Sequence, residues 1–258
     1  MTGLLKRAGF VVALPVVLLA VWWFASAGST SFYSPPLSRI LTTFTETWTL
    51  DRLRADVLPS LLRLAGGYTV AVVVGIGLGV LVGSVRTVRA VLEPVLEFFR
   101  AIPPPVLVPV IMLFAGIDNT MKVVVIATGC VWPILLNTVE GVRATDEVLS
   151  DTARCYGITG SARLRYLVLR SASPQIAAGM RQALSIGIIL MVISEMFAAS
   201  NGLGFTIVQF QRTFAIPQMW SGILLLGLLG FALSVIFRFV ELRALAWYHG
   251  LRQAQRGS

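Results

Sequence analysis

The side chains best suited to bind another molecule lie in one polar stretch between two long apolar ones, residues 140–173. This stretch is too polar to cross a bilayer. It carries five arginines, and loops rich in Lys and Arg face the cytoplasm in membrane proteins. We therefore expect a compact cytoplasmic platform that docks a partner and presents Arg143, Arg154, Arg163, Arg165 and Arg170.

Within this platform, the pattern predicts two short helices with a break at Gly157. Glycine adopts a positive φ without steric cost and often follows the last residue of a helix. The second helix, residues 158–168, carries an apolar stripe beside Arg163 and Arg165, made of Ile158, Leu164, Leu167 and Val168. Such a stripe favours docking to another protein. The alternative is a solvated loop without a partner, which is uncommon for a loop of this length.

Residues suited to catalysis or metal binding are scarce. His249 is the only histidine, which excludes an H-E-x-x-H zinc motif. Cys130 and Cys155 lack CxxC spacing, which argues against a disulfide or a metal site. No base that could activate a serine is apparent. The glycine run at 75–79 lies inside an apolar segment and is not a nucleotide fingerprint. We expect no catalytic residue, no metal and no cofactor in this chain.

One carboxylate, Glu195, lies near the end of an apolar segment. A charged side chain at the centre of a bilayer costs roughly 2.5–3.5 kcal/mol, so such a residue faces protein or water. Two interpretations stay open. Glu195 is either a gate or structural anchor around a pathway, or an interfacial residue satisfied by backbone donors of the turn at residues 201–204.

Other polar groups inside apolar segments have two interpretations each. Arg181 could attract an anion, although snorkelling of its guanidinium to the headgroups is favoured. Glycines spaced by four at 75, 79 and 83 could form a dimer seam or pack within one chain. Four uncharged residues could line a pathway, or they could make hydrogen bonds between helices: Asn137, Thr138, Gln182 and Ser185.

The composition indicates the elements that position these residues. The 258 residues are 56% hydrophobic and 13% charged, against about 25% charged in soluble domains. We expect an all-α polytopic membrane protein with a single domain over 1–258 and six spans. The N- and C-termini are expected in the cytoplasm, span 1 is expected to remain as a signal anchor, and segment 37–63 could lie on the outer membrane surface. The spans are expected at 8–26, 64–83, 88–115 with a kink at Pro103-Pro104-Pro105, 120–139, 175–199 and 219–240.

The platform resembles the cytoplasmic signature loop of permease subunits of bacterial ATP-binding-cassette (ABC) importers. The matching positions are Asp151-Thr152-Ala153, Gly157, Leu167, Leu169 and Pro174. Four identities depart from the family pattern: Asp for Glu, Thr for Ala, Leu for Ile, and Arg170 for a proline. Further segments resemble the nitrate, sulfonate, taurine and bicarbonate branch: Ala101-Ile102-Pro103-Pro104, Trp132 to Thr138, Ser194-Glu195-Met196 and Asn201-Gly202-Leu203-Gly204.

This resemblance implies the type I importer (MetI-like) fold in a bacterial cytoplasmic membrane. The permease would pair with a second, identical chain, and a substrate-binding protein would deliver cargo from outside. Two ATPase subunits would bind ATP and Mg²⁺, so the permease itself would not be an enzyme. The residues implied in ATPase coupling are Asp151, Ala153, Gly157, Ile158, Arg163, Leu164, Leu167, Leu169 and Pro174.

The cargo implied is a small organic or inorganic anion, with a thiamine precursor or an aromatic acid as the alternative within the family. A second class of function is a transporter driven by an ion gradient. That class predicts inverted repeats and acidic residues at the midplane. No convincing repeat is visible, and Glu195 is the only acid deep in a span.

Overall fold

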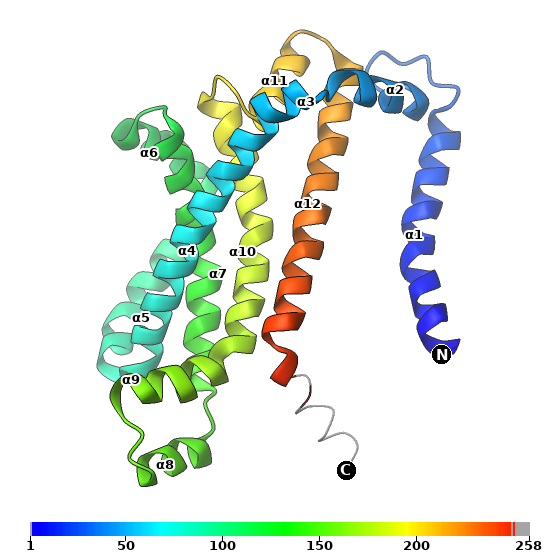
Figure 1. The fold of residues 1–258 in the computed structure, drawn as a ribbon. Coiled ribbons are helices and arrows are strands. Elements are labelled where there is room, and N and C mark those ends of the chain that lie inside the picture. The colour runs from blue at the N-terminus through cyan, green and yellow to red at the C-terminus, as the bar shows by residue number, and fades with distance from the viewer. Residues whose placement is uncertain (1, 249, 251–258) are drawn as a thin grey trace.

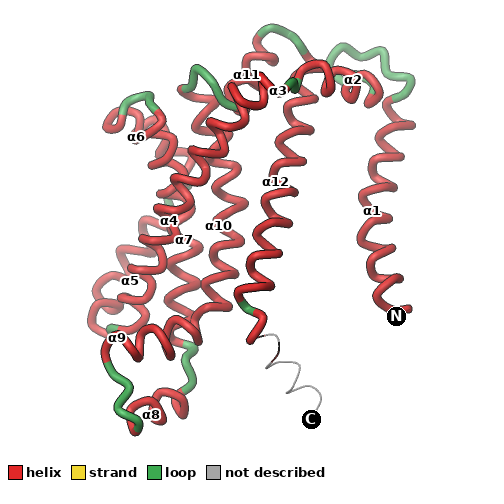
Figure 2. The backbone as a smooth tube through the Cα atoms, in the orientation of Figure 1, coloured by secondary structure: helices red, strands yellow, loops and turns green. Residues whose placement is uncertain are grey.

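The computed structural model describes residues 2–248 and 250, and these contain helices but no strand (Figures 1 and 2). Two of the helices are extended at their N-terminal ends by a π-helical turn, Leu53–Val57 before α4 and Leu164–Val168 before α10. A 3₁₀ turn, Pro104–Leu107, precedes α6. The α-helices are α1 Thr2–Ser26, α2 Leu37–Thr47, α3 Leu50–Arg52, α4 Leu58–Ser84, α5 Arg86–Arg100, α6 Val108–Ala115, α7 Asn119–Arg143, α8 Glu147–Cys155, α9 Gly160–Arg163, α10 Leu169–Ala198, α11 Leu203–Arg212 and α12 Ile216–Ala244.

The core is formed by α4, α7 and α10, with α7 packed along both of the others. Small residues spaced by four on α4 let the α7 backbone approach closely. A Cβ atom added at Gly79 would lie 2.5 Å from Thr138 Cβ and 2.9 Å from the Leu135 carbonyl oxygen. The glycine stripe therefore packs within one chain, which decides between the two interpretations of the sequence. The third pair of core helices, α4 and α10, is joined by a hydrogen bond from the Tyr68 hydroxyl to the Met180 carbonyl at 2.8 Å.

The N-terminal helix and α12 lie at the periphery (Figure 1). Ser26, at the end of α1, accepts a hydrogen bond from the Leu37 N–H at 3.0 Å, and the Trp22 and Trp220 rings lie 6.2 Å apart. A second small core forms where α2, α11 and α12 meet, around Trp48, Leu203, Phe210 and Leu225. The α2 helix thus lies across the end of the bundle and connects α1 to α12.

Four continuous helices among the described residues are long and apolar enough to cross a membrane: Leu50–Ser84, Asn119–Arg143, Gly160–Phe197 and Ile216–Ala244. A further pair, α5 with the helical segment Pro104–Ala115, is apolar enough only when taken together and is bent by 83°. The bend falls at the triple proline, as expected, and such a shape suits a broken span or a re-entrant loop. In α1 the described apolar part is Val16–Ser26.

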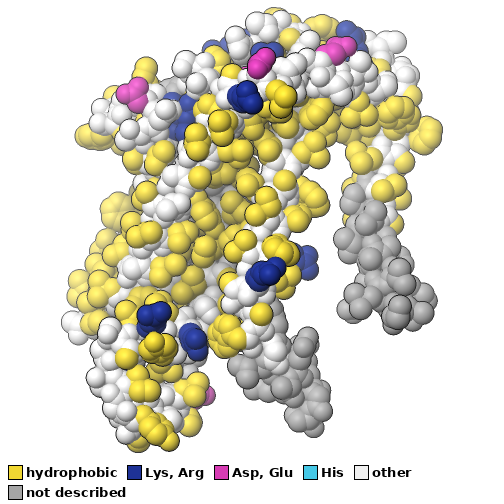
Figure 3. Space-filling view, viewed as in Figure 1, with side chains coloured by type: hydrophobic (Ala, Val, Ile, Leu, Met, Phe, Trp, Pro, Cys, Tyr) yellow, Lys and Arg dark blue, Asp and Glu magenta, His cyan; other side chains and the backbone are white. Residues whose placement is uncertain are grey.

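Side chains are distributed as in a membrane-spanning bundle. Hydrophobic side chains cover the flanks of α4, α10 and α12, while most charged groups gather near the two ends (Figure 3). One end carries α2, α3 and α11, and the other carries α8 and α9 (Figure 1). The protein is therefore an integral membrane protein.

The second helix of the polar platform differs from expectation. The sequence predicted a short helix over 158–168, separate from a span at 175–199. The structure instead begins a helix at Gly160 that continues without a break to the end of α10. Pro174 lies inside α10 without ending it. A proline removes only one hydrogen bond, and helices in membranes tolerate this where neighbours and local adjustments compensate.

Candidate functional sites: the polar loop and the buried ion pair

The polar loop projects from one end of the bundle, and α8 lies farthest from the core (Figure 1). Asp146 begins α8, because its Oδ1 accepts a hydrogen bond from the Leu149 N–H at 3.0 Å. The helix ends at Cys155 and is followed two residues later by Gly157, whose φ is +67°. The Ile158 N–H bonds to the Ala153 carbonyl at 2.8 Å, and the Gly157 N–H bonds to the Arg154 carbonyl at 3.0 Å. This is a Schellman motif, and it confirms the predicted break.

The residues implied in coupling fall into two groups. Asp151, Gly157, Ile158 and Leu164 are exposed. Ala153 is buried, and Leu167, Leu169 and Pro174 are partly buried, so these four support the loop from within. The structure thus places only part of the matched signature on an accessible surface.

The most exposed apolar side chains of the loop were not found by sequence reasoning. Val148 is 73% exposed and Tyr156 is 80% exposed, and Leu149 beside them is also exposed. They lie on α8 and at its C-terminus, whereas the apolar stripe was sought only after Gly157. The available signal was the presence of large apolar residues in an otherwise polar nine-residue helix. We call Val148, Leu149, Tyr156 and Ile158 the loop tip.

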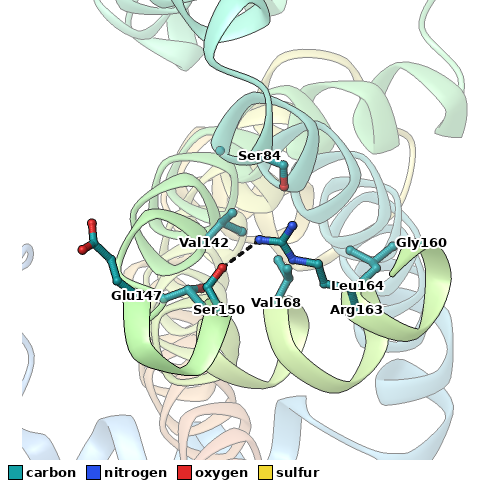
Figure 4. A pocket seen from close by; sticks show the side chains of 10 residues that line it. Ser84, Val142, Glu147, Ser150, Gly160, Arg163, Leu164 and Val168 are labelled. Carbon is teal, nitrogen blue, oxygen red and sulfur yellow. Dashed lines mark hydrogen bonds between the residues drawn. The ribbon is translucent and has the colours of Figure 1, made fainter. Parts of the chain in front are cut away.

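Arg163 does not lie beside a docking stripe as expected. Its guanidinium turns inward, toward the ends of α4 and α7, and Nη2 donates to Ser150 Oγ at 2.9 Å (Figure 4). The surrounding cavity has a volume of about 390 Å³ and is also lined by Ser84, Val142 and Leu164. Arg163 therefore ties the start of the long α9–α10 helix to α8.

At the opposite end of the bundle, Glu195 is fully buried and paired with Arg63, which is 6% exposed. Arg63 Nη1 donates to Glu195 Oε1 at 2.7 Å. The carboxylate also accepts hydrogen bonds from the Ser60 hydroxyl at 2.7 Å and from the Gly204 N–H at 2.9 Å. The buried negative charge of Glu195 is thus balanced by one cation and two further hydrogen-bond donors in a low-dielectric environment.

Arg63 extends this cluster to two further segments. Its Nε donates to Asn119 Oδ1 at 2.8 Å, at the start of α7. Its Nη1 donates to the Asn201 carbonyl at 3.0 Å, and Nη2 donates to Asn201 Oδ1. The buried pair therefore fastens α4, α7, α10 and the turn before α11 at one end of the bundle.

Each interpretation of Glu195 captured part of this arrangement. A backbone donor of the 201–204 turn does bind the carboxylate, but the anchor is the ion pair with Arg63, which sequence reasoning missed. The sequence placed Arg63 just outside a span that began at residue 64. The α4 helix begins earlier, at Leu58, so Arg63 lies one turn inside it. A basic residue at the same end of the bundle as a buried acid was the available signal.

The remaining pathway candidates differ in position. Thr138 is fully buried against α4, and its hydroxyl bonds to the Ile134 carbonyl of its own helix at 2.6 Å, so it matches neither of its two interpretations, a pathway lining or a hydrogen bond between helices. Asn137 donates to Gln182 Oε1 at 3.3 Å between α7 and α10. Ser185 is exposed. Arg181 is exposed and forms an ion pair with Glu241 of α12.

The fold and the two sites define a helical membrane bundle with a projecting polar loop at one end and a buried ion pair at the other. Residues 71–245 match the family described as the binding-protein-dependent transport system inner membrane component. This match spans more than half of the chain, and the chain therefore belongs to that family.

Similar proteins and a solved structure agree with this family assignment. The chain is 29% identical to the taurine transport system permease protein TauC of Escherichia coli, over 90% of this chain and 87% of the relative. It is 31% identical to the bicarbonate transport system permease protein CmpB of Synechococcus elongatus, over 91% and 88%. A crystal structure of an amino acid ABC transporter with histidines has the same fold, with a TM-score of 0.52, 16% identity, and coverage of 83% and 96%.

The chain is thus a permease, the transmembrane subunit of an ABC importer. Such subunits work with ATPase and substrate-binding partners. This membership replaces the ion-gradient alternative raised from the sequence.

Proposed function

We propose that the chain forms the translocation pathway for a small organic or inorganic anion, as a homodimer in the bacterial cytoplasmic membrane. The relatives support the cargo class, because they are named for taurine and bicarbonate, and a third relative in Bacillus subtilis is named as a putative aliphatic sulfonates permease. In this proposal both termini and α8 face the cytoplasm, and the buried ion pair lies at the outer end. Two ATPase subunits, which hold ATP and Mg²⁺, bind the loops, and a substrate-binding protein meets the outer end.

The observation that carries the coupling role is the loop tip. Val148, Leu149 and Tyr156 expose large apolar side chains on the part of the protein that projects farthest from the membrane core. An apolar patch of this kind on a projecting element marks a protein-binding site. We assign it to a groove of the ATPase, with the Gly157 turn fixing the angle between α8 and the long helix.

The long helix supplies the route from the loop to the outer end. It runs for 38 residues from Gly160 to Phe197, which is about 57 Å at 1.5 Å per residue. Arg163 fastens α8 to its start, and Glu195 lies near its other end. A displacement of the loop by the ATPase would therefore tilt α10 as a rigid rod and reach the ion pair that fastens α4, α7 and α10. Two rigid states of the bundle would follow ATPase opening and closing.

The test is co-purification of the permease with its ATPase. Tyr156→Asp places a charge into the apolar docking surface, and Gly157→Val strains a backbone with φ near +67°. We expect both variants to insert in the membrane but to lose ATPase binding by about tenfold or more. For Tyr156→Asp the reason is that burying an unpaired charge costs well above 1.4 kcal/mol, and for Gly157→Val it is the strained turn that no longer orients the loop tip.

Leu50→Asp is the matched control, because Leu50 is equally exposed and apolar but lies at the opposite end. This variant should retain ATPase binding. Full ATPase binding by both loop variants would show that the loop tip is not the docking site.

A further inference from the structure

The outer end of the bundle holds a cavity that the coupling role does not explain. It has a volume of about 630 Å³ and lies beside the buried ion pair. Its lining comes from the start of α4, the start of α7 with the two residues before it, and the turn after α10, and comprises Arg63, Ile117, Asp118, Asn119, Thr120, Lys122, Ala199, Ser200 and Asn201. The volume falls within the range of small-molecule sites.

Two buried cations contribute to this wall. Lys122 is 3% exposed, and its Nζ donates to the carbonyls of Ile117 at 3.0 Å and Asp118 at 3.3 Å. An ammonium has three N–H donors, so one is left without an acceptor among the described residues. Arg63 has five donors, and four are engaged with Glu195, Asn119 and Asn201.

Arg63 also sets the orientation of the two asparagine side chains. A guanidinium only donates hydrogen bonds, so it binds the amide oxygens of Asn119 and Asn201 and not their NH₂ groups. Each NH₂ group is therefore directed away from Arg63, and no acceptor for it is found among the described residues. The hydroxyls of Thr120 and Ser200 add two further donors to the lining.

The cavity is thus rich in hydrogen-bond donors on cationic and amide groups. It contains one carboxylate, that of Asp118, whose side chain is exposed. The other carboxylate nearby, that of Glu195, already accepts hydrogen bonds from Arg63, Ser60 and Gly204. Lys122, which bonds only to backbone carbonyls, remains as the cationic donor, and a hydrogen bond from a charged donor to an oxyanion is about twice as strong as a neutral one.

We propose that this cavity, lined by Lys122, Asn119 and Asn201, is a binding site for the oxyanion group of the cargo as it enters the permease. The inference rests on the proposed function and deepens it by giving the permease a selective site of its own. Glu195 is a positioning residue here. It holds Arg63, and Arg63 turns the two amides so that their NH₂ groups are available to the anion.

The experiment uses the full-length permease in phosphatidylcholine nanodiscs, to which its ATPase is added, without the binding protein. Nitrate, sulfate, bicarbonate and methanesulfonate are titrated separately by calorimetry. We expect saturable binding of at least one of them. If none binds saturably, the proposal fails.

Two neighbouring substitutions change the cavity charge in opposite directions. Asn119→Asp keeps an oxygen for Arg63 but replaces the NH₂ donor with negative charge. Asp118→Asn removes the one exposed carboxylate, which makes no capping hydrogen bond in α7. We expect Asn119→Asp to weaken anion binding about tenfold or more, the cost of one lost charge-assisted bond, and Asp118→Asn to tighten it, because a negative charge is removed from the lining.

Matched variants keep the result interpretable. Asn201→Asp introduces the same negative charge from the turn after α10 and replaces Asn119→Asp if that protein fails to assemble. Arg39→Gln removes an exposed cation at the same end of the molecule and should not change binding. Equal affinity in wild type, Asn119→Asp and Asn201→Asp would overturn the site.

The experiment also distinguishes a bound lipid headgroup from a cargo anion. If phosphatidylglycerol in the nanodisc abolishes binding of the probe anions, the cavity holds a lipid headgroup and the proposal for cargo is wrong.

ATPase association is measured on the same samples. A wild-type protein that binds anion but not ATPase would overturn the proposed function alone, whereas intact ATPase binding with unchanged anion affinity in both variants would overturn this inference alone.

Discussion

At the scale of single residues, the Arg63–Glu195 pair has the strongest stability consequence. Both side chains are almost fully removed from solvent, so each depends on the other to compensate its charge. Removing one partner of a buried pair costs about 3–5 kcal/mol, because it leaves the other charge unpaired. Replacing both by apolar residues removes the charges together and is often close to neutral.

We therefore expect Arg63→Met to lower the thermal unfolding temperature of the detergent-solubilised protein strongly, and Arg63→Met with Glu195→Leu to restore part of the loss. The measurement is a double-mutant cycle. Simple additivity of the two losses would contradict the pairing. Arg52→Met serves as a control, since its ion pair with Asp56 is partly exposed and such pairs contribute little.

At the scale of elements, the helices and the Gly157 turn could be predicted from the sequence, because apolar length and glycine conformation are local properties. The ion pair could not, because it joins residues 132 positions apart in the chain. The long α9–α10 helix was also missed. The polar character of residues 160–173 suggested a boundary before the span predicted at 175–199, whereas the backbone helix continues through both segments. Local composition shows where a helix leaves the apolar layer, but not whether it ends there.

The α4–α7 contact gives a prediction with an internal control. At Gly79 an added Cβ would lie within 3 Å of both a side chain and a backbone oxygen of α7, whereas at Gly77 nothing lies within 4 Å. Gly79→Val should therefore separate the two helices and lower stability by a few kcal/mol, the cost of overpacking. Gly77→Val should change it little. Thermal unfolding of both variants in the same detergent is the test, and equal losses would contradict the packing.

At the scale of the whole molecule, all regions assigned to coupling lie at one end and all regions assigned to cargo entry lie at the other (Figure 1). The loop carrying α8, Arg163 and the loop tip is separated from the ion pair and the oxyanion cavity by the length of α10. A transport protein needs this separation, since the energy source and the cargo reach it from opposite sides of the membrane. The orientation of the bundle therefore determines whether the proposed function is possible.

We expect the α8 end to face the cytoplasm, because the polar loop carries an excess of arginine. Labelling of introduced cysteines in intact cells with a membrane-impermeant maleimide measures this. Cys155 is exposed in the loop and is first replaced by serine, whereas Cys130 is buried and can stay. Thr159→Cys should react only after the cells are opened, and Ser31→Cys, at the opposite end, should react from outside. Both positions are exposed, so a lack of reaction cannot be due to burial. Reaction of Thr159→Cys in intact cells would place the loop tip outside. It would then be unable to meet an ATPase, and the oxyanion cavity would face the cytoplasm, where it could not receive incoming cargo.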